Sequence, residues 1–323
     1  MAVLDDWQNV ARDSADWSAL QARAEVQFFH QAFGDQQALS AALQPFDIIL
    51  PMRERSQFPA AVLEALPRLR FIALTGRPTR HIDMAVCQRR GILCSWSGTY
   101  HPEMTAEYTL GLIIAAQRNI VTGAAALRAG GFQQGVGLGQ TLRGATLGLI
   151  GLGNIGGLVA QYGAALGMEV LAWSRSLTPA RAQLQHATAV TLEELLTRAN
   201  IVSVHLPLTA ETRGLLGTRE LGLMRPHALL VNTSRGPIVD ESSLLVALQA
   251  GRIRAALDVF DVEPLPGDHP LRSAPNVLLS PHLGFATQEC FTAFYQDCIE
   301  NIHAFLDGRP IRLVNPEALG AAP

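Results

Sequence analysis

The stretch LGLIGLGNIGGLVAQYGAALGMEVLAWSR, residues 147–175, decides how this chain folds. Its pattern predicts a short buried strand over 147–150, a glycine-rich turn, a helix and a second strand over 170–173. The glycines at 151, 153 and 156 form G-x-G-x-x-G. In such a unit the first glycine permits the turn, the second lets a pyrophosphate approach the backbone, and the third lets helix and strand pack closely. The stretch therefore predicts a dinucleotide site; a glycine-rich packing turn without a ligand is the alternative.

Apolar strand patterns alternate with helical patterns on both sides of this stretch. Upstream, strands are expected at 2–4, 26–29, 47–50, 71–74 and 92–94, with helices such as 37–43 and 60–66 between them. Downstream, strands are expected at 201–205, 228–232, 255–259 and 277–279, with helices over 191–199 and from an N-cap at Asp240 to Gln249. This rhythm predicts two parallel sheets covered by helices, a smaller one within residues 1–95 and one of about six strands within residues 146–282.

Three further segments indicate how the chain divides into domains. We expect a long helix from His101 to about Leu127, a flexible loop with five glycines over 130–139, and a final helix over 287–306. Because the final helix starts after the second sheet ends, it is expected to return to the first domain, with the tail 310–314 pairing near the N-terminus. We therefore predict an α/β fold of two Rossmann-like, doubly wound domains with a cleft between them: a discontinuous domain of residues 1–98 and 286–323, and an inserted domain of residues 99–285.

Composition and charge exclude several classes of partner. The chain has 323 residues, 48% of them hydrophobic, which is enough for two full-sized cores. A net charge of −3 gives no electrostatic reason to expect nucleic acid or an anionic membrane. No apolar run has the length of a membrane span, and the N-terminal MAVLDDWQ lacks a signal-peptide pattern, so a cytoplasmic location is expected. The four cysteines form no C-x-x-C, so we expect reduced, buried packing residues and no metal site.

The sequence contains no lysine, so all 25 basic residues are arginines. This excludes Schiff-base catalysis and the phosphate-binding lysines of P-loop and kinase sites. It also weakens any argument that rests only on an arginine being present, because this chain offers no other permanently charged basic side chain.

Three polar residues stand at the ends of strands in the second domain: Arg235, Glu263 and His282. Ligands bind at the carboxyl ends of parallel strands, so all three are expected to face the dinucleotide. A guanidinium can hold a carboxylate and polarise a carbonyl, a histidine can exchange a proton, and a neighbouring glutamate stabilises the imidazolium. Together they indicate hydride transfer with acid–base assistance; singly, each also fits a solvated loop residue.

The turn Thr75-Gly76-Arg77-Pro78 follows a predicted strand of the first domain. Its backbone N–H groups suit a small anion such as a carboxylate, and a plain strand-to-loop turn is the alternative.

The chain resembles the D-isomer-specific 2-hydroxyacid dehydrogenases over nearly its whole length. The segments that carry the resemblance are TLGLIGLGNIG (146–156), HLPLTAETRGLL (205–216), LLVNTSRGPIVDESSLLVAL (229–248), AALDVFDVEPLP (255–266), LLSPHLG (278–284), FIALTGRPTRHID (71–83) and AEYTLGLIIAAQR (106–118). The resemblance implies a flavodoxin-like substrate domain over residues 1–98 and 286–323, and a homodimer in which residues 101–140 embrace the partner subunit.

The resemblance also implies roles for individual residues. Arg235 would bind the substrate carboxylate and carbonyl, His282 would be the acid and base, and Glu263 would pair with His282. Gly76 and Arg77 would offer N–H groups to the carboxylate, so the implied substrate set is Gly76, Arg77, Arg235 and His282. The implied cofactor set, in which Asp258 lies near the nicotinamide, is Gly151, Gly153, Asn154, Ile155, Gly156, Ser174, Arg175, His205, Leu206, Pro207, Thr212, Thr233, Ser234, Arg235, Asp258, His282 and Gly284.

The chain departs from the family pattern at the end of the second cofactor-domain strand. Members that use NAD commonly have an aspartate there, which binds the ribose 2′-hydroxyl, whereas this chain has Ser174 followed by Arg175. These residues would accept a 2′-phosphate, so NADP is favoured over NAD; a solvated Arg175, or one stacked on adenine with NAD, is the alternative. Phe285, which either narrows the pocket or fills the hinge, and Arg77 with Arg80 are also atypical, so the substrate cannot be carried over from relatives.

The expected activity is reversible hydride transfer between NAD(P)H and a 2-oxoacid, giving a D-2-hydroxyacid. Two alternatives stay open: a corepressor-like module on the same fold that senses NAD(P), and a relative that oxidises a small inorganic acid such as phosphite. Formate is disfavoured, because formate-oxidising relatives carry glutamine where this chain has Glu263.

Overall fold

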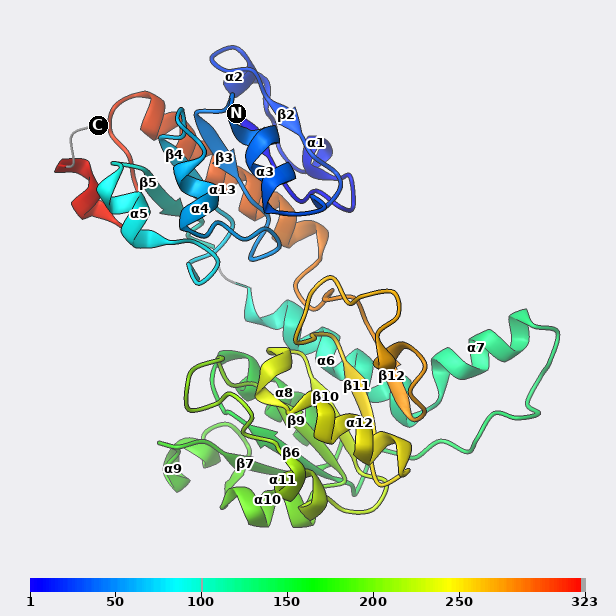
Figure 1. The fold of residues 1–323 in the computed structure, drawn as a ribbon. Helices are drawn as coiled ribbons and strands as arrows, with labels where there is room; N and C mark the ends of the chain where they lie inside the picture. The colour runs from blue at the N-terminus through cyan, green and yellow to red at the C-terminus, as the bar shows by residue number, and fades with distance from the viewer. Residues whose placement is uncertain (100, 321–323) are drawn as a thin grey trace. The chain divides into compact units, whose positions relative to one another are not determined.

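A computed structural model describes residues 1–99 and 101–320 and separates into two compact units. The first unit holds Met1–Tyr100 and Thr287–Pro323, and the second holds His101–Ala286 (Figure 1). Tyr100 and residues 321–323, which the predicted domains include, lie outside the described residues.

The first unit is built on a five-stranded parallel sheet in the order β2-β1-β3-β4-β5. This 2-1-3-4-5 order is that of doubly wound, flavodoxin-like sheets. The strands are β1 (Ala2–Val3), β2 (Gln27–Phe28), β3 (Ile48–Leu50), β4 (Phe71–Leu74) and β5 (Leu93–Trp96). The helices are α1 (Ala11–Ser14), α2 (Ser18–Gln21), α3 (Gln36–Leu43), α4 (Ala60–Glu64), α5 (Met84–Arg89) and α13 (Gln288–Leu306). All residues of β3 and β4 are buried, as expected for strands covered on both faces.

The C-terminal part of the chain completes the first unit. Helix α13 begins after Thr287, whose hydroxyl accepts from the Cys290 N–H, and it packs against β4 and β5. The tail then runs antiparallel along β5, where the Val314 N–H donates to the Cys94 carbonyl and the Trp96 N–H to the Arg312 carbonyl. The expectation that this tail pairs near the N-terminus is wrong. Strand β1 already has a neighbour on each side, whereas β5 is an edge strand with free polar groups.

The second unit contains a seven-stranded parallel sheet in the order β12-β11-β10-β9-β6-β7-β8. Its strands are β6 (Thr146–Ile150), β7 (Glu169–Trp173), β8 (Thr188–Ala189), β9 (Ile201–Val204), β10 (Leu229–Asn232), β11 (Arg254–Leu257) and β12 (Val277–Leu279). The strand order reverses between β6 and β9, which is where ligands bind in such sheets. The sequence predicted about six strands; β8 was missed because two residues at a sheet edge carry no readable periodicity. Two parallel α/β sheets confirm the predicted fold class.

The predicted helix over 101–127 is two helices, α6 (Pro102–Gln117) and α7 (Ile120–Arg128), bent by 61°. Asn119 between them adopts a left-handed conformation with φ 53°, which asparagine tolerates, and its amide donates to the Gly137 carbonyl at 2.7 Å. Helix α6 buries one side against α8 (Asn154–Ala165), whereas α7 has no buried residue and projects with the loop after it (Figure 1).

The other helical segments of the second unit are α9 (Pro179–Gln183), α10 (Leu192–Arg198), α11 (Thr218–Leu223), α12 (Glu241–Gln249) and the 3₁₀ turns η1 (Gly236–Ile238) and η2 (Pro270–Arg272); a third turn, η3 (Pro316–Gly320), lies in the first unit. The predicted N-cap at Asp240 is confirmed, because its carboxylate accepts from the Ser243 N–H at 2.8 Å. All four cysteines are buried, as predicted, and none of them forms a disulfide. In the described part of the chain no single helix is long and apolar enough to cross a membrane; α6 and α7 pass only as a bent pair.

Candidate active site

The glycine-rich turn after β6 is shaped by close backbone contacts. Gly151 has a φ of 104°, and a Cβ there would lie 2.7 Å from the carbonyl oxygen of His205. Gly156, in the first turn of α8, has no room for a side chain because a Cβ would overlap the carbonyl oxygen of Gly151. Both positions therefore require glycine so that α8 can start directly beside β6 and β9.

Gly153 differs from these two because the space beside it is open, with no atom within 4 Å of a Cβ placed there. It is the N-cap of α8, and no side chain caps the helix at this end. The first N–H groups of a helix have no partner within the helix, so those of Asn154, Ile155 and Gly156 are oriented towards this space. An open approach to free N–H groups at the positive end of a helix suits a pyrophosphate. These residues therefore fit a dinucleotide.

The segment after β9 forms a second wall of this site. His205 is hydrogen-bonded through Nε2 to Ser203 Oγ at 2.9 Å, and burial lowers the pKa of His205 to about 4. The hydroxyl of Thr212 donates to the Pro207 carbonyl at 2.7 Å, and the Ser234 hydroxyl donates to the Leu206 carbonyl. The predicted cofactor residues from His205 to Thr212 are thus neutral and held in an ordered loop.

Ser174 and Arg175 follow β7 at the same edge of the sheet. Ser174 is partly buried and Arg175 is exposed. The Thr209 hydroxyl, which donates to Glu211 at 2.6 Å, is the largest cause lowering the pKa of Glu211, and the charge of Arg175 contributes to the same shift. Arg175 is therefore near the carboxylate of Glu211, and neither of the two residues that follow β7 is acidic.

Arg235 follows β10 in a tightly fixed segment. The Asn232 amide donates to the Arg235 carbonyl at 2.9 Å, and Arg235 Nη1 donates to the Ser234 carbonyl at 2.7 Å. A Cβ on Gly236 would overlap the backbone of Phe260. Glycine at this position lets the Arg235 segment pack directly on the loop after β11 that leads to Glu263.

Glu263 and His282 form a hydrogen-bonded pair at this edge. His282 Nδ1 donates to Glu263 Oε2 at 2.5 Å, and Glu263 Oε1 accepts from the Phe260 N–H at 2.9 Å. The two side chains are 31% and 35% exposed, so solvent or a ligand can reach them. Because Nδ1 is occupied by Glu263, Nε2 is the nitrogen left to exchange a proton with a substrate. The ring of Phe285 lies 5.7 Å from that of His282, nearly perpendicular to it.

Asp258 is buried beside this pair, at the end of β11. Its carboxylate accepts from the Leu283 and Gly284 N–H groups, each at 2.8 Å, and from the Ser280 hydroxyl at 2.5 Å. Burial is the largest effect on Asp258 and raises the pKa of its carboxyl. Thr233, which also belongs to the predicted cofactor set, is buried at the end of β10. The second unit thus brings all predicted residues between 151 and 284 to one edge of its sheet.

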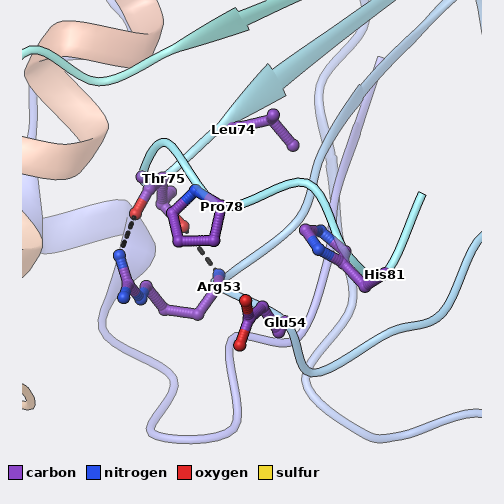
Figure 2. Close-up of a pocket in the computed structure, with 7 residues that line it drawn as sticks. Arg53, Glu54, Leu74, Thr75, Pro78 and His81 are labelled. Carbon is purple, nitrogen blue, oxygen red and sulfur yellow. Dashed lines mark hydrogen bonds between the residues drawn. The ribbon is translucent and has the colours of Figure 1, made fainter. Parts of the chain in front are cut away.

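Gly76 and Arg77 belong to the first unit, where they follow β4. They adjoin a pocket with about 180 Å3 of unfilled space, lined by Arg53, Glu54, Leu74, Thr75, Gly76, Pro78 and His81 (Figure 2). Arg53 Nη1 donates to the Thr75 carbonyl at 3.1 Å, which places a guanidinium beside Gly76. The guanidinium of Arg77 lies instead over the Trp96 ring, 5.3 Å from its centre. The sequence argument missed Arg53, although a basic residue just after a buried strand was a usable signal.

No group of three His, Cys, Asp or Glu side chains that could hold a metal ion occurs within residues 1–99 and 101–320.

Comparisons with known proteins agree with this geometry. The profile "D-isomer specific 2-hydroxyacid dehydrogenase, NAD binding domain" matches residues 110–284. A glyoxylate reductase of Aeropyrum pernix is 42% identical over 267 residues, which is 80% of this chain and 80% of that protein. A D-3-phosphoglycerate dehydrogenase of Mycobacterium bovis is 38% identical over 275 residues, covering 85% of this chain but 52% of that protein.

A solved oxidoreductase from Ralstonia solanacearum superposes with a TM-score of 0.94 at 36% identity, covering 100% of this chain and 98% of that one. The chain therefore belongs to the D-isomer-specific 2-hydroxyacid dehydrogenase family, and it is an NAD(P)-dependent enzyme that interconverts 2-oxoacids and D-2-hydroxyacids.

Proposed function

We propose that His282 is the acid and base of this reaction and that Arg235 holds the substrate. The observation that carries the proposal is the hydrogen bond from His282 Nδ1 to Glu263 Oε2 at 2.5 Å. The carboxylate fixes the ring, so that Nε2 donates a proton to the substrate carbonyl oxygen during reduction and takes it back during oxidation. Arg235 binds the substrate carboxylate and polarises the adjacent carbonyl.

The nicotinamide, when bound, supplies or accepts the hydride at the C2 carbon of the substrate. Asp258 fixes the backbone of Leu283 and Gly284 next to His282. The N–H groups at the start of α8 hold the pyrophosphate, as the open space at Gly153 supports.

We propose that the preferred substrates are small 2-oxoacids such as glyoxylate. Relatives named glyoxylate reductase match at 42% and 36% identity, and the Phe285 ring lies 5.7 Å from that of His282, where it would limit the size of a substrate. The test is the rate of NADPH and NADH oxidation with glyoxylate, hydroxypyruvate, pyruvate and bulkier 2-oxoacids. We expect kcat/KM to fall as the side chain grows; a bulky 2-oxoacid reduced fastest would contradict the proposal.

We also propose that the turn at Gly76 and Arg77 binds an anionic group of the substrate with its N–H groups. The guanidinium of Arg53 beside Gly76 supports a negative charge there. Arg53→Ala is then expected to raise KM for the 2-oxoacid and to leave the Kd of NADPH unchanged; the reverse pattern would exclude this role.

We propose NADP as the preferred cofactor, because Ser174 and Arg175 put a hydroxyl and a positive charge where a carboxylate would repel a 2′-phosphate.

We further propose a homodimer formed through residues 101–140. Along α7 and the loop after it, Ile120, Val121, Leu127 and Phe132 are more than half exposed and Leu138 is 99% exposed, which is unusual for adjacent apolar side chains in a monomer. Light scattering is expected to show a dimer that Leu127→Glu weakens; an unchanged mass would contradict the proposed surface. Buried cysteines without disulfides suit a reducing compartment, and we propose a cytoplasmic location, which cell fractionation tests.

A further inference from the structure

Helix α6 contacts both loops that carry the proposed reacting residues, through two neighbouring hydroxyl groups. Tyr108 Oη lies 2.6 Å from Ser280 Oγ, two residues before His282. Thr109 Oγ1 lies 2.8 Å from Thr233 Oγ1, two residues before Arg235. One helix thus reaches the ends of two strands that are separated in the sheet by β11.

The direction of the hydrogen bonds on the His282 side follows from the partners available. The Ser280 hydroxyl donates its proton to Asp258 Oδ1, so the Tyr108 hydroxyl must donate to Ser280 Oγ. Asp258 in turn accepts from the N–H groups of Leu283 and Gly284. A continuous chain of hydrogen bonds therefore runs from Tyr108 through Ser280 and Asp258 to the backbone immediately after His282.

This chain acts on a residue whose backbone needs support. His282 has a φ of 55°, a left-handed conformation that a non-glycine residue keeps only where its surroundings hold it. Packing adds to the hydrogen bonds, because a Cβ on Gly284 would lie 3.0 Å from Asp258 Oδ2 and 3.5 Å from the Thr105 methyl group of α6. The helix and the loop are thus in direct contact.

The same reasoning applies to the Arg235 side. The Thr109 hydroxyl donates to the Thr105 carbonyl at 2.7 Å, so Thr233 must be the donor in the Thr109–Thr233 hydrogen bond. Thr109 and Thr233 are both buried, and the next residue, Ser234, donates to the Leu206 carbonyl. The backbone that leads into Arg235 is thereby tied to α6 on one side and to the cofactor loop on the other.

We propose that Tyr108 and Thr109 are positioning residues: α6 holds the two loops in register, with Tyr108 acting through the His282 loop and Thr109 through the Arg235 loop. The inference rests on the roles proposed above for His282 and Arg235. The inference predicts different kinetic effects for the two hydroxyl groups, because the proton-transfer step depends on His282 whereas substrate binding depends on Arg235.

The experiment compares Tyr108→Phe and Thr109→Val with the wild type, using NADPH and the 2-oxoacid of the panel that the wild type reduces fastest. For Tyr108→Phe we expect kcat to fall roughly five- to tenfold, the effect of losing one buried hydrogen bond, with KM within about twofold. For Thr109→Val we expect KM to rise roughly fivefold with kcat within about twofold. Thr109→Ser, which keeps the hydroxyl group, is expected to have the KM of the wild type.

Tyr162→Phe on α8 and Thr197→Val on α10 are matched controls, and activities are normalised to the folded fraction. The same change in kcat and KM in both variants would overturn the inference and indicate a merely structural contact. If His282→Ala lost activity while both variants behaved like the wild type, only this inference would fail. If His282→Ala stayed active, the underlying assignment would fail and the inference with it.

Discussion

The carboxyl edges of the two parallel sheets differ in how fully some of their buried ionisable groups are hydrogen-bonded. In the second unit, His282 is paired with Glu263, Asp258 accepts from two N–H groups, and the buried His205 is hydrogen-bonded to Ser203. In the first unit, Asp5 and His81 are buried, and Asp5 Oδ2 and both ring nitrogens of His81 have no hydrogen-bond partner among the described residues. Burial raises the pKa of Asp5 to about 6 and lowers that of His81 to about 4.

The difference shows that a shared topology does not determine the chemistry of a sheet edge. The His282–Glu263 pair remains about a third exposed, whereas burial pushes Asp5 and His81 of the first unit, and His205 of the second, towards their neutral forms. In the first unit, a guanidinium group, that of Arg53, lies beside Gly76.

The largest expected effect is the loss of the His282–Glu263 pair. Replacement of His282 by Ala is expected to lower kcat by about 10²–10⁴-fold, the usual contribution of a general acid. A second His–Glu pair of the same unit, His269 with Glu241 at 3.0 Å, is the matched control, and His269→Ala is expected to keep kcat within about twofold. Steady-state kinetics check both. Equal losses of kcat in His282→Ala and His269→Ala would show that the His282–Glu263 pair is no more important for catalysis than another His–Glu pair of the unit.

The next effect concerns the cofactor part of the same edge. Arg175→Ala is expected to weaken NADPH binding by roughly 10–100-fold, the loss of a charge-assisted hydrogen bond, and NADH binding by less than about threefold. Kd values from cofactor fluorescence measure this, with the exposed Arg181→Ala on α9 as the control. Similar losses for both cofactors would show that Arg175 does not contact a 2′-phosphate.

A smaller effect is expected at the edge of the first unit, in stability and not in rate. The pKa of Asp5 is raised from 3.8 to about 6, so the ionised carboxylate destabilises the fold increasingly as pH rises from about 4 to 6, and by a constant amount above that. Asp5→Asn, which also tolerates the φ of 61°, is expected to increase the free energy of unfolding by about 1–2 kcal/mol at pH 7 and very little at pH 4.

Denaturant unfolding at several pH values measures the Asp5 effect. Asp6→Asn is the contrasting variant, since that carboxylate accepts from the Val10 and Ala11 N–H groups and its loss should destabilise the protein at pH 7. A stabilising effect of Asp5→Asn that does not depend on pH would contradict the explanation.

The smallest expected effect sharpens the proposed substrate size. Phe285→Leu removes the ring that stands perpendicular to His282 at 5.7 Å. We expect the ratio of kcat/KM between bulky and small 2-oxoacids to rise by roughly two- to fivefold, since pocket discrimination by a few methylene groups is modest. An unchanged ratio would indicate that Phe285 only fills space beside the loop.

Local sequence patterns predicted much of the fold, and the omissions have physical causes. The strand at Phe71–Leu74 and the N-cap at Asp240 are confirmed because a buried run and a capping side chain encode them locally. The break at Asn119 was missed because it depends on a contact with Gly137, 18 residues away.

Prediction of the proposed site from the sequence is limited in the same way, by contacts between distant residues. Single residues such as Arg235 and His282 stand out at strand ends, whereas the Tyr108–Ser280 hydrogen bond joins positions 172 residues apart. A tyrosine in an apolar helix is typical of an ordinary core residue, and only the folded backbone shows what its hydroxyl reaches.

The antiparallel pairing of the C-terminal tail with β5 has a consequence for solubility. Open strand edges recruit other chains, and natural sheets protect them by keeping edge strands short or covered. In this protein the outer strands β2, β8 and β12 have two, two and three residues, whereas β5 has four and is the one that the tail covers. A chain ending before Arg312 would therefore expose the longest free edge in the molecule, and aggregation would be its first defect.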